Sequence, residues 1–169
     1  NDPGNIVAGN RAAYVVTRKD QFNNPTATGS QTVYLYSDSA GTNDAFYDAA
    51  SGGSLISSVE ISNGFSSVGF WYYDDLATTA TVTASDNATS PDGTAGVDDA
   101  TDSVIVSAAA TSQFSVNDPG SMTAGTRAAY VVTRKDAFNN VTISGAQTVY
   151  LYSDSAGAND AFYSVSSGG

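Results

Sequence analysis

The segment DNATSPDGTAGVDDATD (86–102) contains five aspartates and no basic residue. Carboxylate oxygens at short spacing, with glycines that permit tight turns, are typical of Ca²⁺ sites, in which the ion takes about six to eight oxygen ligands. No Glu closes the segment, so the spacing is not that of an EF-hand. The sequence predicts a calcium site built from Asp86, Asp92, Asp98, Asp99 and Asp102; the alternative left open is a solvated acidic turn.

The composition narrows the chemistry further. The 169 residues include no Cys and no His, and the net charge is −11. Disulfides, thiolate metal sites and histidine-based catalysis are therefore excluded. Acidic residues number seventeen, and all but Glu60 are Asp, which favours turns and metal-binding loops over helices. Such a charge repels nucleic acid and anionic membranes and attracts cations, so we expect neither nucleic-acid binding nor membrane insertion.

An enzyme is not expected. No Ser lies in a recognisable nucleophile motif. Asp74 and Asp75 could form an acid–base pair, but adjacent strand residues point to opposite faces. The only lysines, Lys19 and Lys135, are better explained as exposed residues than as cross-linking ones.

Two glycosylation sequons and one aromatic run each have a structural as well as a functional interpretation. Asn87 and Asn140 begin glycosylation sequons, which also arise by chance. The aromatic run 71–73 could offer a sugar-binding platform, but strand alternation directs at least one of its rings into the core.

The elements that must position these side chains are short strands. Gly, Ser, Thr and Asn punctuate the chain every few residues, and the runs between them are β-branched and aromatic. Strands are predicted at 11–18, 31–37, 55–62, 67–73, 79–85, 102–108 and 111–116, with a short one at 45–47.

Alternation assigns faces to these strands. In 31–37, Val33 and Leu35 share one face. In 55–62, Leu55, Val59 and Ile61 are predicted to point one way. In 67–73, Val68, Phe70 and Tyr72 share a face. In 79–85, Ala80, Val82 and Ala84 are predicted to point inward and the threonines outward.

About seven short strands at this spacing predict an all-β fold, a β-sandwich with immunoglobulin-like order; a barrel is the less favoured alternative. The sequence also repeats. Residues 1–53 align without a gap with 117–169, with 13 mismatches in 53 positions and a constant offset of 116. Such a period suits a whole domain.

The repeat sets the expected boundaries. In immunoglobulin-like order, 111–116 is the first strand of the second copy. We therefore expect a first unit at 1–109 that lacks its own first strand, and a second unit at 110–169 that is the N-terminal half of the next repeat. Three strands leave one face uncovered, so the second unit needs strands from outside this segment, from the same chain or from another copy.

The motifs TAGTRAAYVVTRKDAFNN, TVYLYSDS, SSVEISNGFSSVGFWYYDD and TATVTAS resemble the invasin/intimin-type bacterial immunoglobulin-like repeats. The resemblance covers the whole period. It implies tandem repeats of very large secreted or surface proteins, as adhesin stalks and filament components. The acidic segment 86–102 departs from the family pattern.

The expected function is therefore structural: a repeat of an extracellular fibre or adhesin stalk that provides rigid spacing and self-assembly. Its partners would be neighbouring repeats or copies of itself, with a host or surface glycan elsewhere in the full protein. The alternative is a carbohydrate- or surface-binding module.

Two observations favour a stiff array. The connection SVIVSAAATSQFSV between units has no Gly or Pro, unlike a flexible linker. Immunoglobulin-like order also places 86–102 and the turn 19–30 at one pole, and places SDSAGTND (37–44), Asp74, Asp75 and Asp2 at the other. Each junction would then gather aspartates that a divalent ion could neutralise.

Overall fold

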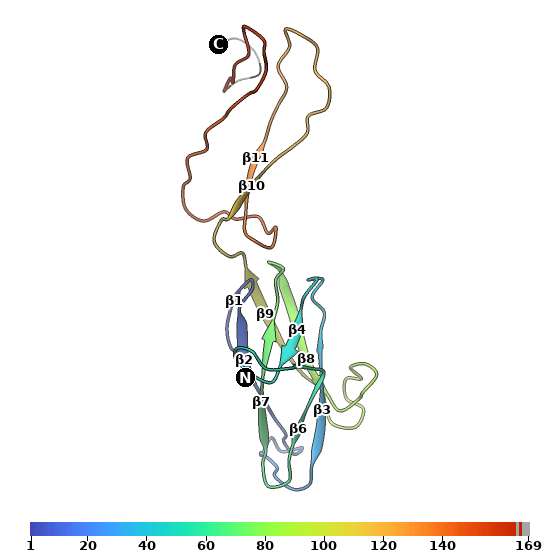
Figure 1. Cartoon of the computed structure of the whole chain (residues 1–169). Coiled ribbons are helices and arrows are strands. Elements are labelled where there is room, and N and C mark those ends of the chain that lie inside the picture. The colour runs from blue at the N-terminus through green and yellow to red at the C-terminus, as the bar shows by residue number, and fades with distance from the viewer. Residues whose placement is uncertain (165, 167–169) are drawn as a thin grey trace.

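A computed structural model describes residues 1–164 and 166 (Figure 1). The described residues form strands, turns and loops without a helix, so none of their segments is a helix that could span a membrane. The predicted all-β class is confirmed.

The first unit contains two sheets. One has the strand order β1 (Ile6–Val7), β9 (Ala100–Ser107), β8 (Thr79–Ser85), β3 (Gln31–Ser37) and β6 (Ser58–Ile61). The other has the order β2 (Arg11–Thr17), β7 (Ser67–Tyr73), β4 (Ala45–Tyr47) and β5 (Leu55–Ile56). The pairings are antiparallel except for β1 with β9, which is parallel. The sequence did not predict the two-residue strand β1.

One hydrophobic core fills the space between the two sheets. Val33, Leu35 and Val82 come from one sheet, and Phe70 and Tyr72 come from the other. The rings of Tyr14 and Phe70 stack with centroids 5.4 Å apart, and Phe46 lies edge-on to Phe70 at 5.8 Å. Two sheets that enclose one core are the arrangement of a β-sandwich.

One predicted face assignment is wrong, and one outward-facing residue is less exposed than expected. The strand predicted at 55–62 is broken at Ser57, because β5 pairs with β4 in one sheet while β6 pairs with β3 in the other. Leu55 is consequently 68% exposed, although Ile61 is buried. Thr83, predicted to face outward into solvent, is only 9% exposed.

The cover over Thr83 involves the neighbouring strand β3 and the loop that directly follows β8. Thr83 pairs with Tyr36 across β8 and β3. The Tyr36 hydroxyl donates a 2.5 Å hydrogen bond to the Asn87 carbonyl, which holds the loop after β8 against the sheet. The outer face of β8 is therefore shielded where alternation alone predicts an open surface.

The second unit follows β9 after a short connection, and its described residues form little regular structure (Figure 1). Strand β10 (Gln113–Val116) pairs with β11 (Val132–Lys135) in a two-stranded antiparallel sheet. Residues 147–153, which repeat β3, form no strand. The strands that flank β3 in the first unit have no counterpart among the described residues of the second.

Candidate metal centre and repeat junction

The acidic loop 86–99 connects β8 to β9 and brings three of the five predicted ligands together. Asp86 directly follows β8, Asp99 directly precedes β9, and Asp92 lies midway along the loop. Carboxylate oxygens of these three residues lie within 4.8 Å of one another. The predicted acidic site is thus present as a group of three carboxylates.

Hydrogen bonds fix one side of each carboxylate. Asp99 Oδ2 accepts from the backbone nitrogens of Asp92 at 2.9 Å and Gly93 at 2.8 Å. Asp86 Oδ2 accepts from the Val97 nitrogen at 3.1 Å. Asp92 Oδ2 accepts from the Asn87 side-chain amide at 3.0 Å. Backbone and amide donors therefore orient the three groups before any ion binds.

The carboxylate oxygens without hydrogen-bond partners are the main indication of a bound cation. Asp86 Oδ1 and Asp99 Oδ1 are buried and have no hydrogen-bond partner in the protein. A buried charged oxygen without a partner is costly, and buried polar atoms are nearly always paired. A divalent cation between the carboxylates would satisfy both oxygens, so the residues present fit such an ion.

The electrostatics and backbone of the loop also suit a cation. Although burial opposes ionisation of Asp99, hydrogen bonds from the Ser85 hydroxyl and from backbone N–H groups of Gly93 and Asp92 hold its pKa below the ordinary value. Gly96, at φ +74°, packs so closely that a Cβ there would lie 2.5 Å from Asp86 Oδ2. The oxygen-only donor set suits a hard cation such as Ca²⁺.

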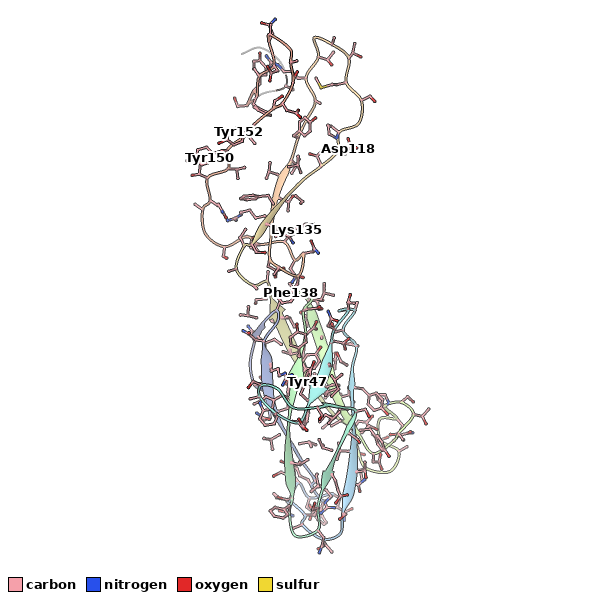
Figure 2. The ribbon with its side chains drawn as sticks, viewed as in Figure 1. Tyr47, Asp118, Lys135, Phe138, Tyr150 and Tyr152 are labelled. Carbon is pink, nitrogen blue, oxygen red and sulfur yellow. The ribbon has the colours of Figure 1, made fainter. Side chains whose placement is uncertain are left out.

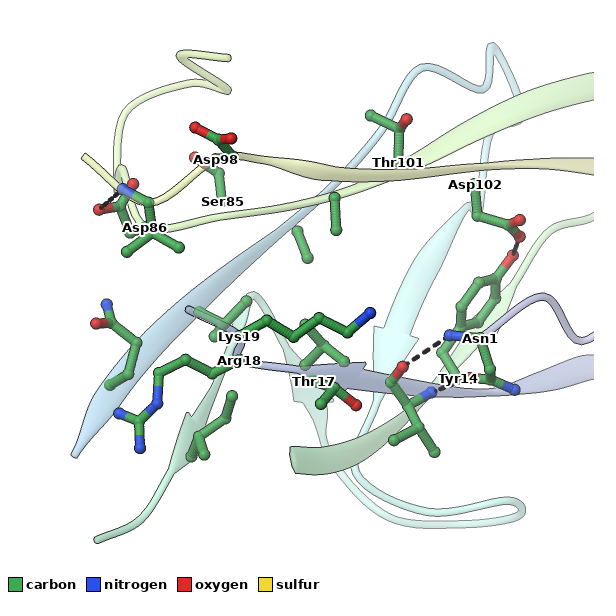
Figure 3. Close-up of a pocket in the computed structure, with 18 of the residues that line it drawn as sticks. Asn1, Tyr14, Thr17, Arg18, Lys19, Ser85, Asp86, Asp98, Thr101 and Asp102 are labelled. Atoms are coloured by element: carbon green, nitrogen blue, oxygen red, sulfur yellow. Dashed lines mark hydrogen bonds between the residues drawn. The ribbon is translucent and has the colours of Figure 1, made fainter. Parts of the chain in front are cut away.

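The other two predicted ligands lie outside this group. Asp102, on β9, accepts a 2.9 Å hydrogen bond from the Tyr14 hydroxyl. Burial, together with this contact, raises the Tyr14 pKa. Asp98 is exposed, and both residues line a groove beside β2 (Figure 3). Sequence reasoning did not identify Ser85 and Asn87, although their position beside Asp86 in the chain was a usable signal.

The second notable feature is the junction between the units, where the Asn140 side chain joins them. Its Nδ2 donates to the Asp75 carbonyl at 2.8 Å and to Asp136 Oδ2 at 2.9 Å. Its Oδ1 accepts from the Ala77 nitrogen at 2.8 Å. Asn140 is 6% exposed, so this sequon nitrogen is fully engaged rather than available for a glycan.

Asp136 completes this contact. It is fully buried and accepts 2.9 Å hydrogen bonds from the backbone nitrogens of Ala109, Phe138 and Asn140. Burial opposes its ionisation, but these donors and the Asn140 amide outweigh it and lower the Asp136 pKa. A buried carboxylate with several charge-assisted hydrogen bonds holds the connection between units in one conformation.

An aromatic ring packs beside the polar contact. Phe138 lies where the two units meet (Figure 2). It covers Gly9 of the first unit, where an added Cβ would lie 2.5 Å from the ring. Gly9 has φ +86°, which a residue with a side chain adopts only under strain. Position 9 therefore requires glycine for two reasons: its backbone conformation is strained for other residues, and the Phe138 ring leaves no room for a Cβ atom.

The predicted gathering of aspartates at the junction holds in part. Asp75 lies at the junction with Asp136, and Asp74 is its neighbour in the chain. Burial, and to a smaller extent the charges of Asp74 and Asp75, raise the pKa of Asp44. Asp74 accepts from the Tyr72 hydroxyl at 2.9 Å and from the Leu76 nitrogen at 2.9 Å. Asp2, predicted at this pole, instead lines the groove beside β2.

No protein-family model, curated protein or solved structure matches this chain. The chain's own geometry is therefore the basis for assigning a function.

Proposed function

We propose that this chain is a structural repeat of a long extracellular fibre or adhesin stalk, built from tandem immunoglobulin-like β-sandwiches of period 116. Its work is rigid spacing and self-assembly. Calcium bound by the acidic loop would stiffen each repeat.

The strand order supports an immunoglobulin-like assignment. The order β2-β7-β4 matches three neighbouring strands of one sheet of such a sandwich, and the order β3-β8-β9 matches the three strands of the other. The repeated sequence supports the tandem arrangement, because 53 aligned residues differ at only 13 positions.

The junction is the observation that carries the proposal. A flexible linker would leave the two units without specific contacts. Here the connection between β9 and β10 is short, and the Ala109 nitrogen within it donates to buried Asp136. Asn140 then joins the second unit to the backbone of Asp75 and Ala77. A fixed relative orientation is what a spacer requires and what an isolated binding module does not.

Distance measurement between the units tests this proposal. Spin labels placed on β7 and on β11 should give one narrow distance distribution by double electron–electron resonance. Asn140→Ala should broaden it. The matched control is Asn24→Ala, because Asn24 is the equivalent residue of the first unit and its side chain bonds to Asp20 within its own turn. A broad distribution in the unmodified chain contradicts a rigid spacer.

A second candidate function rests on an aromatic surface. Trp71 and Tyr73 alternate with fully buried Tyr72 and lie half-buried on the outer face of β7, beside Tyr47 of β4. The Arg11 guanidinium lies 3.3 Å from the Tyr47 ring centre and also donates to the Ala49 carbonyl at 2.6 Å. One face of the Tyr47 ring is thus already covered by Arg11 and is not available to a sugar, which favours the spacer function over the binding module. Glycan-array binding that Trp71→Ala abolishes would favour the carbohydrate-binding module instead.

A further inference from the structure

The outer face of the sheet β2-β7-β4-β5 carries a row of apolar side chains at one level. Ala13 of β2 lies opposite Trp71 of β7, and Trp71 lies opposite Tyr47 of β4. Tyr47 in turn lies opposite Leu55 of β5. Leu55 is 68% exposed, Ala13 is exposed, and the two rings are half-buried. The row therefore forms one apolar strip that crosses all four strands and is open to solvent.

Gly69 keeps this surface flat beside the indole. It lies on the same face of β7 as Trp71, two residues earlier, and is exposed. Its φ is not positive, and an added Cβ would meet only the Tyr14 carbonyl oxygen, at 3.5 Å, which is an ordinary contact. Neither the backbone nor the space within the unit therefore requires glycine here. Glycine in a strand weakens it and often marks a place where another chain or a ligand approaches closely.

The face also carries no carboxylate. Acidic residues number seventeen in the chain, but none is among the outward-facing residues of β2, β7, β4 and β5. The carboxylate next along the chain, Asp48, lies beyond the end of β4. The one charged side chain is Arg11, whose guanidinium lies over the Tyr47 ring and donates to the carbonyls of Ala49 and Gly52. Two copies of a chain with net charge −11 repel each other, so they can approach most closely where carboxylates are absent.

The outer face of the other sheet lacks these properties. Glu60 points outward from β6, and Asp38 directly follows β3. The acidic loop 86–99 is held against the same face by the hydrogen bond from Tyr36. Ile105 is 47% exposed but stands alone among the threonines and serines of β8 and β9. Contact between two such faces would bring carboxylates together, so only the first face suits a partner of the same charge.

The size of the face sets the strength of one contact. With strands about 4.8 Å apart and a rise of about 3.3 Å per residue, the four strands present about 300 Å² of flat surface. A stable dimer buries about 800 Å² per partner, so a single face supports only weak association. Repetition strengthens it, because each further contact between two joined arrays is intramolecular. The second unit repeats one element of the face, since the Arg127 guanidinium lies 3.7 Å from the Tyr163 ring centre, as Arg11 lies over Tyr47.

We propose that this face binds the same face of a second copy of the chain, so that two tandem arrays pair side by side. The apolar row of each copy would then be covered without opposing any carboxylate of these strands. The contact joins the same surface on both copies, so it closes as a pair, while length comes from the tandem repeat itself. The inference rests on the self-assembly part of the proposed function and names the surface that carries it.

Intermolecular paramagnetic relaxation detects such weak contacts, and the natural absence of cysteine makes a spin label specific. Chains carrying a nitroxide at Ser67→Cys, on the outer face of β7, are mixed at millimolar concentration with isotope-labelled chains that carry no nitroxide. Amide signals of Tyr47 and of residues 69–73 should broaden severalfold more than with the nitroxide at Ser103→Cys, on the outer face of β9. Equal broadening from both positions, or none from Ser67→Cys, overturns the proposal.

Matched apolar substitutions test which side chain carries the contact. Leu55→Ser removes exposed apolar surface from the proposed face and should reduce the broadening about fivefold. Ile105→Ser makes the same kind of change on the other outer face and should leave the broadening unchanged. Both positions are exposed, so both variants should fold, which their amide spectra verify. Dependence on Ile105 and not on Leu55 overturns the proposal.

Salt distinguishes an apolar contact from an electrostatic one. Raising the salt concentration to about 0.5 M screens the repulsion between copies and should increase the broadening, whereas a decrease would mean that charge carries the contact and overturns the proposal. A carbohydrate occupant is tested by adding a glucose tetrasaccharide. A shift of the Trp71 indole signal, together with no broadening between copies, assigns the face to a glycan instead. The spin-label distances across the junction are measured within one chain, so they test the spacer separately.

Discussion

Residues 1–53 and 117–169 have nearly the same sequence. The described residues of the two segments have very different surroundings. Tyr14 is 4% exposed, and its equivalent Tyr130 is 56% exposed. Leu35 is 5% exposed, whereas Leu151 is 51% exposed. Tyr150 and Tyr152 project freely from the second unit (Figure 2). The comparison teaches that the repeated sequence alone does not bury these side chains.

The missing cover can be named. In the first unit, β3 pairs with β6 on one side and β8 on the other, and β2 pairs with β7. All three partners come from residues 54–109, which follow the repeated segment. Among the described residues of the second unit no such partner is present, and 147–153 forms no strand although it has the same sequence as 31–37. Sheet structure here depends on contacts between distant segments rather than on local propensity.

The turn after the second strand shows the opposite trend. Asp20 and Asp136 each accept hydrogen bonds from the backbone two and four residues later. Phe22, however, is 74% exposed, whereas Phe138 is 38% exposed, because Phe138 packs on Gly9 of the first unit. The first unit thus has a closed core and a free turn, while the second has an open core and a docked turn.

The largest expected effect comes from a charge in the closed core. Val82→Asp should unfold the first unit, because a buried unpaired carboxylate costs several kcal/mol, comparable with the whole stability of a domain. Thr79→Asp, at an exposed position on the same strand, should be tolerated. Circular dichroism and thermal melts of the two variants provide the measurement. Equal behaviour would show that the strand faces are misassigned.

The matched leucines test the comparison directly. Leu35→Ala should lower the free energy of unfolding by about 2–5 kcal/mol, as buried leucines do. Leu151→Ala should change it by less than about 0.5 kcal/mol, as exposed positions do. Chemical denaturation followed by circular dichroism, which reports on both units, provides the measurement. Similar losses from both substitutions would mean that the second unit has a core of its own.

Calcium should stabilise the first unit alone, since only that unit contains the acidic loop. At a free Ca²⁺ concentration of 100 times the dissociation constant, the gain is about 2.7 kcal/mol. Asp92→Asn should abolish the gain, whereas Asp98→Asn, outside the three-carboxylate group, should retain it. Thermal melts with Ca²⁺ and with chelator measure this effect. Superimposable curves for the unmodified chain would rule out the site.

The smallest expected effect separates the two turns. Phe138→Ala should weaken docking of the second unit by about 1 kcal/mol, because the ring is only partly buried. Phe22→Ala should have no effect on docking. Amide hydrogen exchange at residues 136–140 reports docking, and it should accelerate only in the first variant. Acceleration in both would indicate a general effect of losing the ring.

Much of the sandwich was predictable because alternation is a local property. The bounds of 67–73 and 79–85 match β7 and β8, and Phe70, Tyr72 and Val82 face the core as predicted. The burial of Thr83 was not predictable, since it depends on the contact between Tyr36 and the loop residue Asn87. The change of sheet at Ser57 likewise depends on which strands are available as partners.

The sequence predicted that the loop contains a group of aspartates, but it did not predict which of the five come together. Five aspartates in one loop indicate a cation, yet the path of the loop decides which carboxylates converge. Asp102 instead lies within strand β9, where its carboxylate accepts a hydrogen bond from the Tyr14 hydroxyl. The junction was foreseen only as a rigid connection. The role of Asn140 depends on its contact with Asp75, 65 residues earlier in the chain.

The central proposal is that the second unit is the first half of a domain like the first unit. Appending a further copy of residues 54–109 after Gly169 tests this claim most directly. Amide hydrogen exchange at residues 149–152 should then slow to the rates of residues 33–36, as new neighbours complete the sheet. If 149–152 still exchanges as fast as in the chain without the addition, the tandem-domain account is contradicted.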